Sequence, residues 1–193
     1  MRKAVAMGSN WQGKGVLLGV TGGVAAYKAV ALASRMTQAG ALVDVVMTPS
    51  ALEFVTPLMF AAVTHRKVHT NPWESDRKPE HIALAERPHV IVVAPCTANT
   101  MAKLAAGLAD NLLTSVLLAA KKPVLLAPAM NTGMWTARAT VRNLATLRDD
   151  GMRFVGPNSG NLACGDSGVG RMAEPDEIFA AVENLLAGTD ADG

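Results

Sequence analysis

The sequence has few of the residues on which nucleic-acid binding and membrane insertion depend. Aromatic residues make up only 4% of the chain, and the formal net charge is +2, with no long run of one sign. No apolar run reaches the ~18 residues of a membrane-spanning helix, and residues 1–10 have no apolar core of the kind that a signal peptide carries. We therefore expect neither a nucleic-acid partner nor a membrane segment.

Cysteine is equally scarce, and its distribution argues against cross-linking and metal binding. The two cysteines, Cys96 and Cys164, lie far apart in the chain and in different contexts. They make no ligand pair for zinc, and they need not form a disulfide. We therefore expect no metal site and a reducing, cytoplasmic setting. Cys96 follows an apolar run and is expected to be structural.

The chain is nevertheless rich in core-forming residues, with 50% hydrophobic residues among 193. This supports one globular domain over residues 1–193, with loose ends at 1–13 and 188–193. Apolar runs alternate with helical patterns, which predicts a doubly wound, mostly parallel α/β sheet of the Rossmann or flavodoxin type in a three-layer sandwich. The expected strands are 15–20, 41–47, 90–94, 124–127 and 153–155; the expected helices are 24–38, 57–63, 81–86, 98–106, 111–120, 136–149 and 175–186.

The most informative stretch is the turn after the first predicted strand. Gly22 and Gly23 let the backbone approach a ligand closely, and the helix that follows directs N–H groups and its positive dipole end towards an anion. The dinucleotide fingerprint would need glycine at Thr21 and glycine or alanine at Val24. The second strand ends in the hydroxyls of residues 48–50 rather than in a carboxylate. The pattern favours a mononucleotide such as FMN over NAD, although two glycines can also simply make a tight turn.

Other unusual stretches follow the remaining predicted strands. They begin at Pro95, at Pro128 and at Gly156, and each is rich in small and polar residues. In parallel sheets, ligands bind beyond the carboxyl ends of the strands. We therefore expect these loops to meet the Thr21 turn and the hydroxyls of Thr48 and Ser50 at one rim.

Three residues could carry chemistry, and each has an ordinary structural explanation as well. His81 can serve as a general base or be a surface histidine near a helix start. Asn131 can bind a carboxylate through its amide or simply form a turn. Cys164 lies in a glycine-rich loop, where its thiol can deliver a proton to a bound substrate or be a small apolar residue. Thr97 and Asn99 offer polar groups to a flavin ring.

Five blocks together resemble one protein family, in order along the chain. They are residues 22–28 (Gly-Gly-Val-Ala-Ala-Tyr-Lys), 80–84 (Glu-His-Ile-Ala-Leu), 94–100 (Ala-Pro-Cys-Thr-Ala-Asn-Thr), 128–135 (Pro-Ala-Met-Asn-Thr-Gly-Met-Trp) and 163–172 (Ala-Cys-Gly-Asp-Ser-Gly-Val-Gly-Arg-Met). The chain resembles the phosphopantothenoylcysteine decarboxylases, within the FMN-dependent cysteine decarboxylases, over about residues 14–187.

The resemblance implies an activity in coenzyme A biosynthesis. The cysteine of 4′-phosphopantothenoylcysteine would be oxidised to a thioaldehyde, lose CO₂ to give an enethiolate, and be reduced to 4′-phosphopantetheine. FMN would carry the redox chemistry. The family forms trimers, sometimes assembled into dodecamers, with FMN sites between subunits, so we expect a homo-oligomer. Many bacterial members also carry a C-terminal synthetase.

The resemblance also assigns roles to individual positions. His81 would be the base, Asn131 would hold the substrate carboxylate, and Cys164 would donate the proton of the final reduction. The expected FMN contacts are Gly22, Gly23, Val24, Thr48, Ser50, Thr97, Ala98, Asn99, Thr100 and Ala129. The expected substrate contacts are Met130, Asn131, Asn161 and Ala163.

Alternative functions share much of this pattern. A peptidyl-cysteine decarboxylase would use FMN and His81 on a peptide C-terminal cysteine but stop at the enethiol, so it would not need Cys164. A non-catalytic FMN-binding regulatory protein would be expected to lose one of His81, Asn131 and Cys164. A flavin prenyltransferase fits less well, because the block around Cys164 does not match it.

Overall fold

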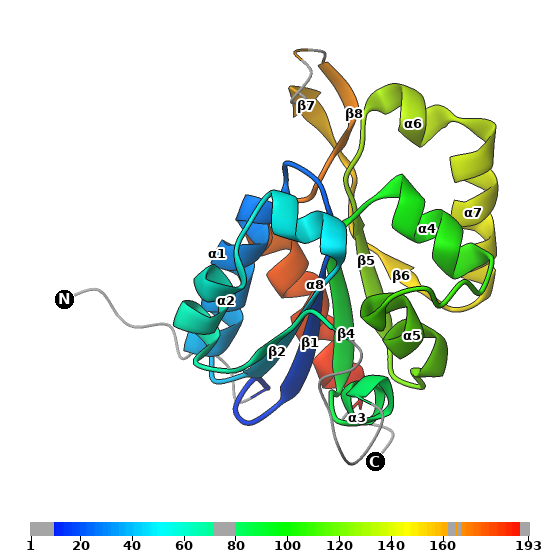
Figure 1. The fold of residues 1–193 in the computed structure, drawn as a ribbon. Helices are drawn as coiled ribbons and strands as arrows, with labels where there is room; N and C mark the ends of the chain where they lie inside the picture. Colours follow the sequence, from blue (N-terminus) through cyan, green and yellow to red (C-terminus); the bar gives the residue numbers. More distant parts are fainter. Residues whose placement is uncertain (1–9, 72–79, 162–164, 166, 190–193) are drawn as a thin grey trace.

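The computed structural model describes residues 10–71, 80–161, 165 and 167–189. Its centre is a six-stranded parallel sheet with the order β3-β2-β1-β4-β5-β6 (Figure 1). The strands are β1 (Gly15–Val20), β2 (Leu42–Met47), β3 (Val68–His69), β4 (Val90–Cys96), β5 (Val124–Pro128) and β6 (Arg153–Phe154). This is the strand order of a doubly wound Rossmann fold, so the predicted fold class is confirmed.

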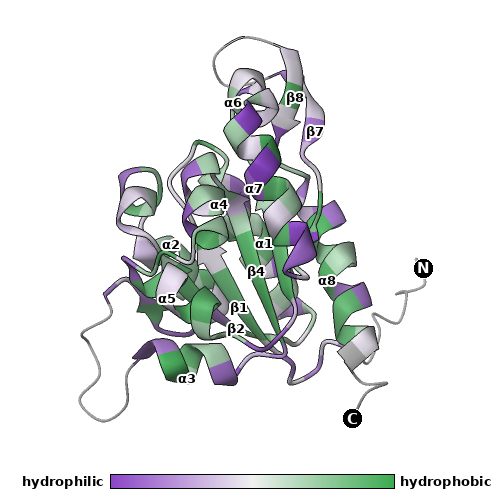
Figure 2. Ribbon diagram, turned by 90° about the vertical axis from the view of Figure 1, so that its right-hand side faces the viewer, coloured by the Kyte–Doolittle hydropathy of each residue, from purple (hydrophilic) through white to green (hydrophobic). Residues whose placement is uncertain are grey.

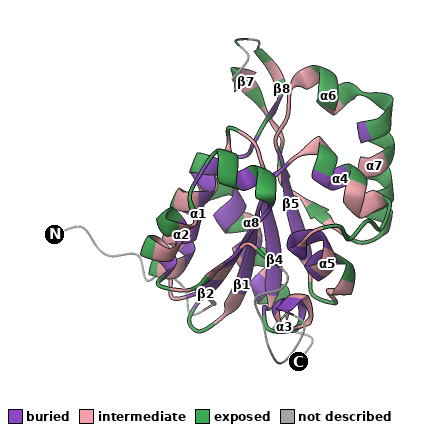
Figure 3. Ribbon diagram, viewed as in Figure 1, coloured by how far each residue is buried: buried purple, intermediate pink, exposed green. Residues whose placement is uncertain are grey.

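Helices cover both faces of the sheet and make the three layers. On one face lie α1 (Ala26–Gln38), α2 (Pro57–Thr64) and α8 (Pro175–Thr189); on the other lie α3 (Glu80–Glu86), α4 (Ala98–Ala105), α5 (Leu112–Ala119) and α7 (Arg138–Asp149). Neighbouring strand residues alternate between the two cores, as Val45 and Val46 do. Burial on both faces explains why the strands are continuous apolar runs, and Figures 2 and 3 show them enclosed.

Some small elements were not predicted. An antiparallel hairpin, β7 (Asn158–Asn161) and β8 (Ser167–Arg171), stands beyond the sheet beside the short helix α6 (Thr132–Thr136) (Figure 1). The sequence does predict a short helix after β2, capped by Ser50 and running through Val55; the structure has the 3₁₀ turn η1 (Pro49–Glu53) there, with Thr48 at the cap position. The polar residues 64–80 predict a long surface loop, but the strand β3 lies inside this stretch, of which residues 72–79 lie outside the described part.

The prediction of a loose segment through residue 13 is wrong at Trp11. Its side chain is only 1% exposed and stacks on Phe179 of α8, with ring centroids 4.3 Å apart. The indole N–H donates a hydrogen bond of 2.9 Å to Glu183, also on α8. The aromatic contact and the satisfied N–H fasten the segment before β1 to the α8 layer.

In the described residues, no helix is long and apolar enough to cross a membrane.

We expect Trp11→Ala to lower the free energy of unfolding by about 3–5 kcal/mol, because it removes a large buried side chain and leaves a cavity against Phe179. Urea unfolding at a fixed protein concentration would measure the loss. The matched control is Gln12→Ala. The Gln12 side chain follows Trp11 in the sequence but is exposed, so its removal should change the free energy of unfolding by about 0.5 kcal/mol or less. Equal stabilities of the two variants would contradict the anchoring role of Trp11.

Candidate functional site

A cleft of about 900 Å³ opens at the carboxyl ends of the strands. Its lining comes from the turns and helix starts after β1, β2, β4 and β5, and from the hairpin. The strand order reverses between β1 and β4, and this switch point is where open α/β sheets bind ligands. All five stretches that were expected to converge on one rim contribute to the lining.

The Thr21 hydroxyl ties the two strands at the switch point together. It is buried and donates to the Pro95 carbonyl at 2.8 Å, while it accepts from the Thr97 N–H at 3.2 Å. One side chain therefore joins the end of β1 to the end of β4. A glycine at this position, as the dinucleotide fingerprint demands, could not make either bond.

The first wall of the cleft is a cradle made by the turn after β1 and the turn after β2. A Cβ on Gly22 would lie 2.5 Å from the Ser50 Cβ and 2.6 Å from its carbonyl oxygen, so only glycine fits. The Thr48 hydroxyl oxygen is buried and has no hydrogen-bond partner among the described residues. No side chain caps the start of α1. A buried hydroxyl and an uncapped helix start are the groups that bind a phosphate.

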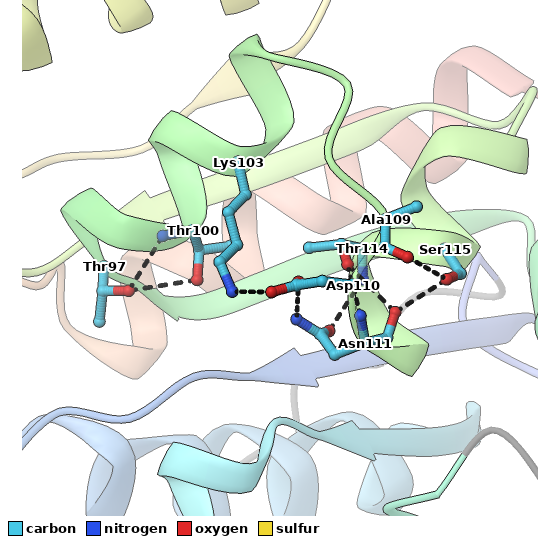
Figure 4. Close-up of polar contacts among 8 residues, drawn as sticks. All are labelled: Thr97, Thr100, Lys103, Ala109, Asp110, Asn111, Thr114 and Ser115. Atoms are coloured by element: carbon cyan, nitrogen blue, oxygen red, sulfur yellow. Dashed lines mark hydrogen bonds and ion pairs between the residues drawn. The ribbon is translucent and has the colours of Figure 1, made fainter.

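The second wall is the start of α4, together with the loop into α5 (Figure 4). Thr97 caps α4, and its hydroxyl accepts the Thr100 N–H at 3.3 Å. One turn further on, Lys103 reaches across to Asp110, whose other oxygen accepts from the Asn111 amide at 2.9 Å. The hydrogen bond from Lys103 lowers the pKa of Asp110. This wall thus offers hydroxyls and an amide, with its charges already paired.

The third wall is the loop after β5, held in place by the hairpin. Asn131 caps α6, and its amide oxygen accepts from the Gly133 N–H at 2.7 Å. The Met130 N–H donates to the Gly170 carbonyl at 2.9 Å. A Cβ on Gly170 would lie 2.2 Å from the Met130 carbonyl oxygen, and one on Gly168 would lie 2.4 Å from the Thr132 hydroxyl. The glycines of β8 therefore allow the hairpin to lie directly against the Asn131 loop.

The structure brings most of the predicted site residues together. Those that line the cleft are Gly22, Gly23, Val24, Thr48, Ser50, Thr97, Ala98, Asn99, Thr100, Ala129, Met130, Asn131 and Asn161. Ala163 and Cys164 lie outside the described residues, so their predicted roles stay predictions.

His81 is the exception, because it does not line the cleft. It belongs to α3, which precedes β4 and lies at the opposite end of the sheet from the hairpin (Figure 1). Its side chain is half-buried. Within one chain, His81 therefore lies apart from the other predicted site residues, and its predicted role as the base stays a prediction.

Several cleft residues were not predicted, and the charged ones matter most. They are Lys28, Lys103, Asp110 and Arg171. Helical spacing could have found two of them, since Lys28 follows Val24, and Lys103 follows Asn99, by four positions on the same helix face. Nothing local marks Arg171, which reaches the cleft through the hairpin.

Comparison with known proteins identifies the family. A family model described as Flavoprotein matches residues 6–187. The chain belongs to the flavoprotein family. The predicted family is thereby confirmed, and the matched region contains every residue that lines the cleft.

Individual flavoproteins are similar over almost the whole chain. The coenzyme A biosynthesis bifunctional protein CoaBC of Bacillus subtilis is 47% identical over 176 residues, which are 90% of this chain and 43% of that protein. CoaBC of Mycolicibacterium smegmatis is 44% identical over 92% of this chain and 43% of its own length. This chain therefore spans less than half the length of these curated relatives.

Solved structures of similar flavoproteins share the fold. A mutant PPC decarboxylase in complex with pantothenoylaminoethenethiol has a TM-score of 0.82 and 38% identity, and the match covers 91% of this chain and 100% of that one. The FMN-dependent cysteine decarboxylase SpaF also has a TM-score of 0.82, with 31% identity over 94% of this chain and 99% of that one.

The residues of the first wall fit FMN, the flavin that the resemblance implies. The Thr48 hydroxyl is an unused donor, and the space beside Gly22 excludes a side chain. A phosphate group needs such donors and such a close approach of the backbone. The hydroxyls and amide of the second wall are suited to the polar edge of the flavin ring.

We expect Gly22→Ala to weaken FMN binding while Gly23→Ala leaves it nearly unchanged. The added methyl at residue 22 collides with Ser50, whereas at residue 23 the nearest atom, the Thr97 Cγ2, is 3.7 Å away. Overpacking costs about 1–3 kcal/mol, so the FMN dissociation constant should rise at least about fivefold in Gly22→Ala. Quenching of flavin fluorescence would measure both constants, and an equal effect of the two substitutions would contradict the cradle.

Burial also decides the reactivity of Cys96. The side chain is fully buried at the end of β4, and burial raises the pKa of its thiol to about 12. Since the thiolate is the nucleophile, Cys96 should be inert at neutral pH. In a Cys164→Ser variant, we expect no reaction with a disulfide reagent at about pH 8 in the native state, and one reactive thiol after unfolding. Rapid labelling of Cys96 in the native variant would contradict its burial at the end of β4.

Proposed function

We propose that this chain is an FMN-dependent decarboxylase that converts 4′-phosphopantothenoylcysteine to 4′-phosphopantetheine in coenzyme A biosynthesis. The observation that carries the proposal is the position of Asn131. This residue caps α6 and lines the same cleft as the phosphate cradle of Gly22, Thr48 and Ser50. The similarity to CoaBC proteins and to PPC decarboxylase structures supports the choice of substrate.

The chain's residues position the substrate and move its protons. FMN, when bound, supplies the chemistry of hydride acceptance and return. The oxygen of the Asn131 amide accepts from the Gly133 N–H, so the NH₂ group is the part of this amide that would donate to a substrate carboxylate. With FMN bound to accept and return the hydride, the chain's own residues would take the proton of the substrate thiol and hold the carboxylate that leaves as CO₂.

The base is His81, acting in the cleft of a neighbouring copy. Two observations support an assembly of several copies. The helix α3, which contains His81, lies at the opposite end of the sheet from the hairpin that lines the cleft (Figure 1). The apolar side chains of Val24 and Tyr27, which line the cleft, are also exposed, as are those of Phe54 after η1 and Leu58 on α2. A second copy of the chain, packed on this apolar surface, would cover it and bring its own α3 to the cleft, as the expected trimer or dodecamer requires.

Cys164 completes the proposed reaction as the proton donor to the reduced product. Asn161, which ends β7 three positions before Cys164 in the sequence, lines the cleft, and the predicted role of Cys164 follows from the resemblance. In contrast to Cys96, it lies in a polar, glycine-rich stretch. Without it, the enethiolate would remain oxidised, as in the peptide-modifying alternative.

Mass spectrometry of the product tests this function. Purified protein that contains FMN is mixed with 4′-phosphopantothenoylcysteine. We expect the substrate to lose CO₂ alone, which means decarboxylation followed by reduction. Loss of CO₂ and two further hydrogens would indicate a reaction that stops at the enethiol, as in a peptidyl-cysteine decarboxylase. An unchanged substrate, with FMN still bound, would overturn the proposal in favour of a peptide substrate or a binding protein.

Variants of His81 and Asn131 test the shared site. We expect His81→Asn and Asn131→Ala each to retain FMN and to release no CO₂. Co-expression of the two variants should restore part of the activity, because some clefts then combine an intact Asn131 from one copy with an intact His81 from another. Failure of the mixed assembly to recover activity, while each variant still forms oligomers, would contradict a base supplied by a neighbouring copy.

A further inference from the structure

The cleft holds more positive charge than the cofactor cradle uses. Among the described residues, the charged side chains that line it are Lys28, Lys103, Arg171 and Asp110. Lys103 and Asp110 form an ion pair on the second wall (Figure 4), so their charges cancel inside the cleft. Lys28 and Arg171 have no carboxylate beside them in the lining.

Lys28 and Arg171 instead share one carboxylate behind the cleft wall. The Lys28 ammonium donates to the Glu174 Oε1 at 2.9 Å, and the Arg171 guanidinium pairs with the same oxygen. Glu174 does not line the cleft. The Lys28 side chain is only 10% exposed, so it is held in one position between α1 and the base of β8. These three side chains together carry one positive charge, and the two cations, unlike Glu174, line the cleft.

Glu174 remains an anion in this arrangement. The hydrogen bond from Lys28 is the main reason that its pKa is lowered, and Arg171 adds to the effect. Glu174 therefore keeps both cations in place across the neutral range and cannot release them by protonation there. An arginine held in this way presents a planar donor group that matches a phosphate.

We propose that Lys28 and Arg171, held by Glu174, bind the phosphate of the substrate at a subsite separate from the cradle for the FMN phosphate. The inference rests on the proposed function, because it assigns the anionic end of that substrate. The cradle at Gly22, Thr48 and Ser50 already supplies donors for a cofactor phosphate. The Lys28–Arg171 subsite joins α1 to β8. The strand β8 is bonded to the Asn131 loop through the Met130 N–H and the Gly170 carbonyl, which favours the substrate, the ligand that Asn131 is proposed to bind.

The experiment compares substrates with and without the phosphate. The preference is the ratio of kcat/KM for 4′-phosphopantothenoylcysteine to kcat/KM for pantothenoylcysteine. We expect Arg171→Gln to reduce this ratio about tenfold or more, the effect of losing a hydrogen bond between charged groups. The loss should come through the phosphorylated substrate alone. Lys28→Gln should act in the same direction, and calorimetry with 4′-phosphopantetheine and pantetheine would give the same preference as an equilibrium measurement.

Lys103→Gln is the matched control, since it removes an equal charge from the same cleft. We expect it to keep the phosphate preference, because Asp110 already neutralises Lys103. A preference lost in Lys103→Gln and kept in Arg171→Gln would overturn the proposal. An equal loss for both substrates in Arg171→Gln would also overturn it, since the arginine would then act on another part of the substrate.

The cofactor's phosphate is tested separately, with FMN and riboflavin as probes. We expect Arg171→Gln to leave the FMN dissociation constant, and its ratio to that of riboflavin, unchanged. A rise in this ratio would assign the pair to the cofactor and overturn the substrate subsite. If the wild-type protein decarboxylates neither substrate, the proposed function fails as well. If it decarboxylates both with no preference for the phosphate, only the subsite fails.

Discussion

The site depends on one buried hydroxyl, that of Thr21. It donates to the end of β4 and accepts from the first residue beyond it, so the two strands at the switch point end together. The turn at Gly22 and Gly23 follows β1, and Thr97, which caps α4, follows β4. Without this bridge, the two walls of the cleft would be positioned only by the ladder of the sheet, which ends on β1 at Gly19. The threonine that breaks the dinucleotide fingerprint is therefore the residue that builds the cleft.

The central fold was predictable because its strands are buried on both faces. Such strands must be continuous apolar runs, and β1, β2, β4 and β5 were recognised as such. The phosphate cradle was also predictable, since the glycine turn and the hydroxyls after β2 are local signals. The strand β3 has only two residues, and β7 consists of Asn, Ser and Gly, so neither forms an apolar run that the sequence could reveal.

The parts of the site that escaped prediction depend on contacts between distant segments. The hairpin exists because Gly168 and Gly170 can lie against residues 130–132, which no local pattern reveals. Arg171 and Lys28 meet through Glu174, across more than a hundred residues of chain. His81 was predicted as a site residue, but its position away from the cleft was not, because its sequence block does not show at which end of the sheet α3 lies.

The hairpin has a consequence for how the protein yields to thermal fluctuation. A two-stranded ribbon is marginal on its own, and in β7 and β8 only Gly170 is buried, whereas the strands below are almost fully buried (Figure 3). Its backbone hydrogen bonds should therefore break at a far lower free energy than those of β1 or β4. When this ribbon opens, the third wall of the cleft loses its support, while the sheet beneath it stays folded.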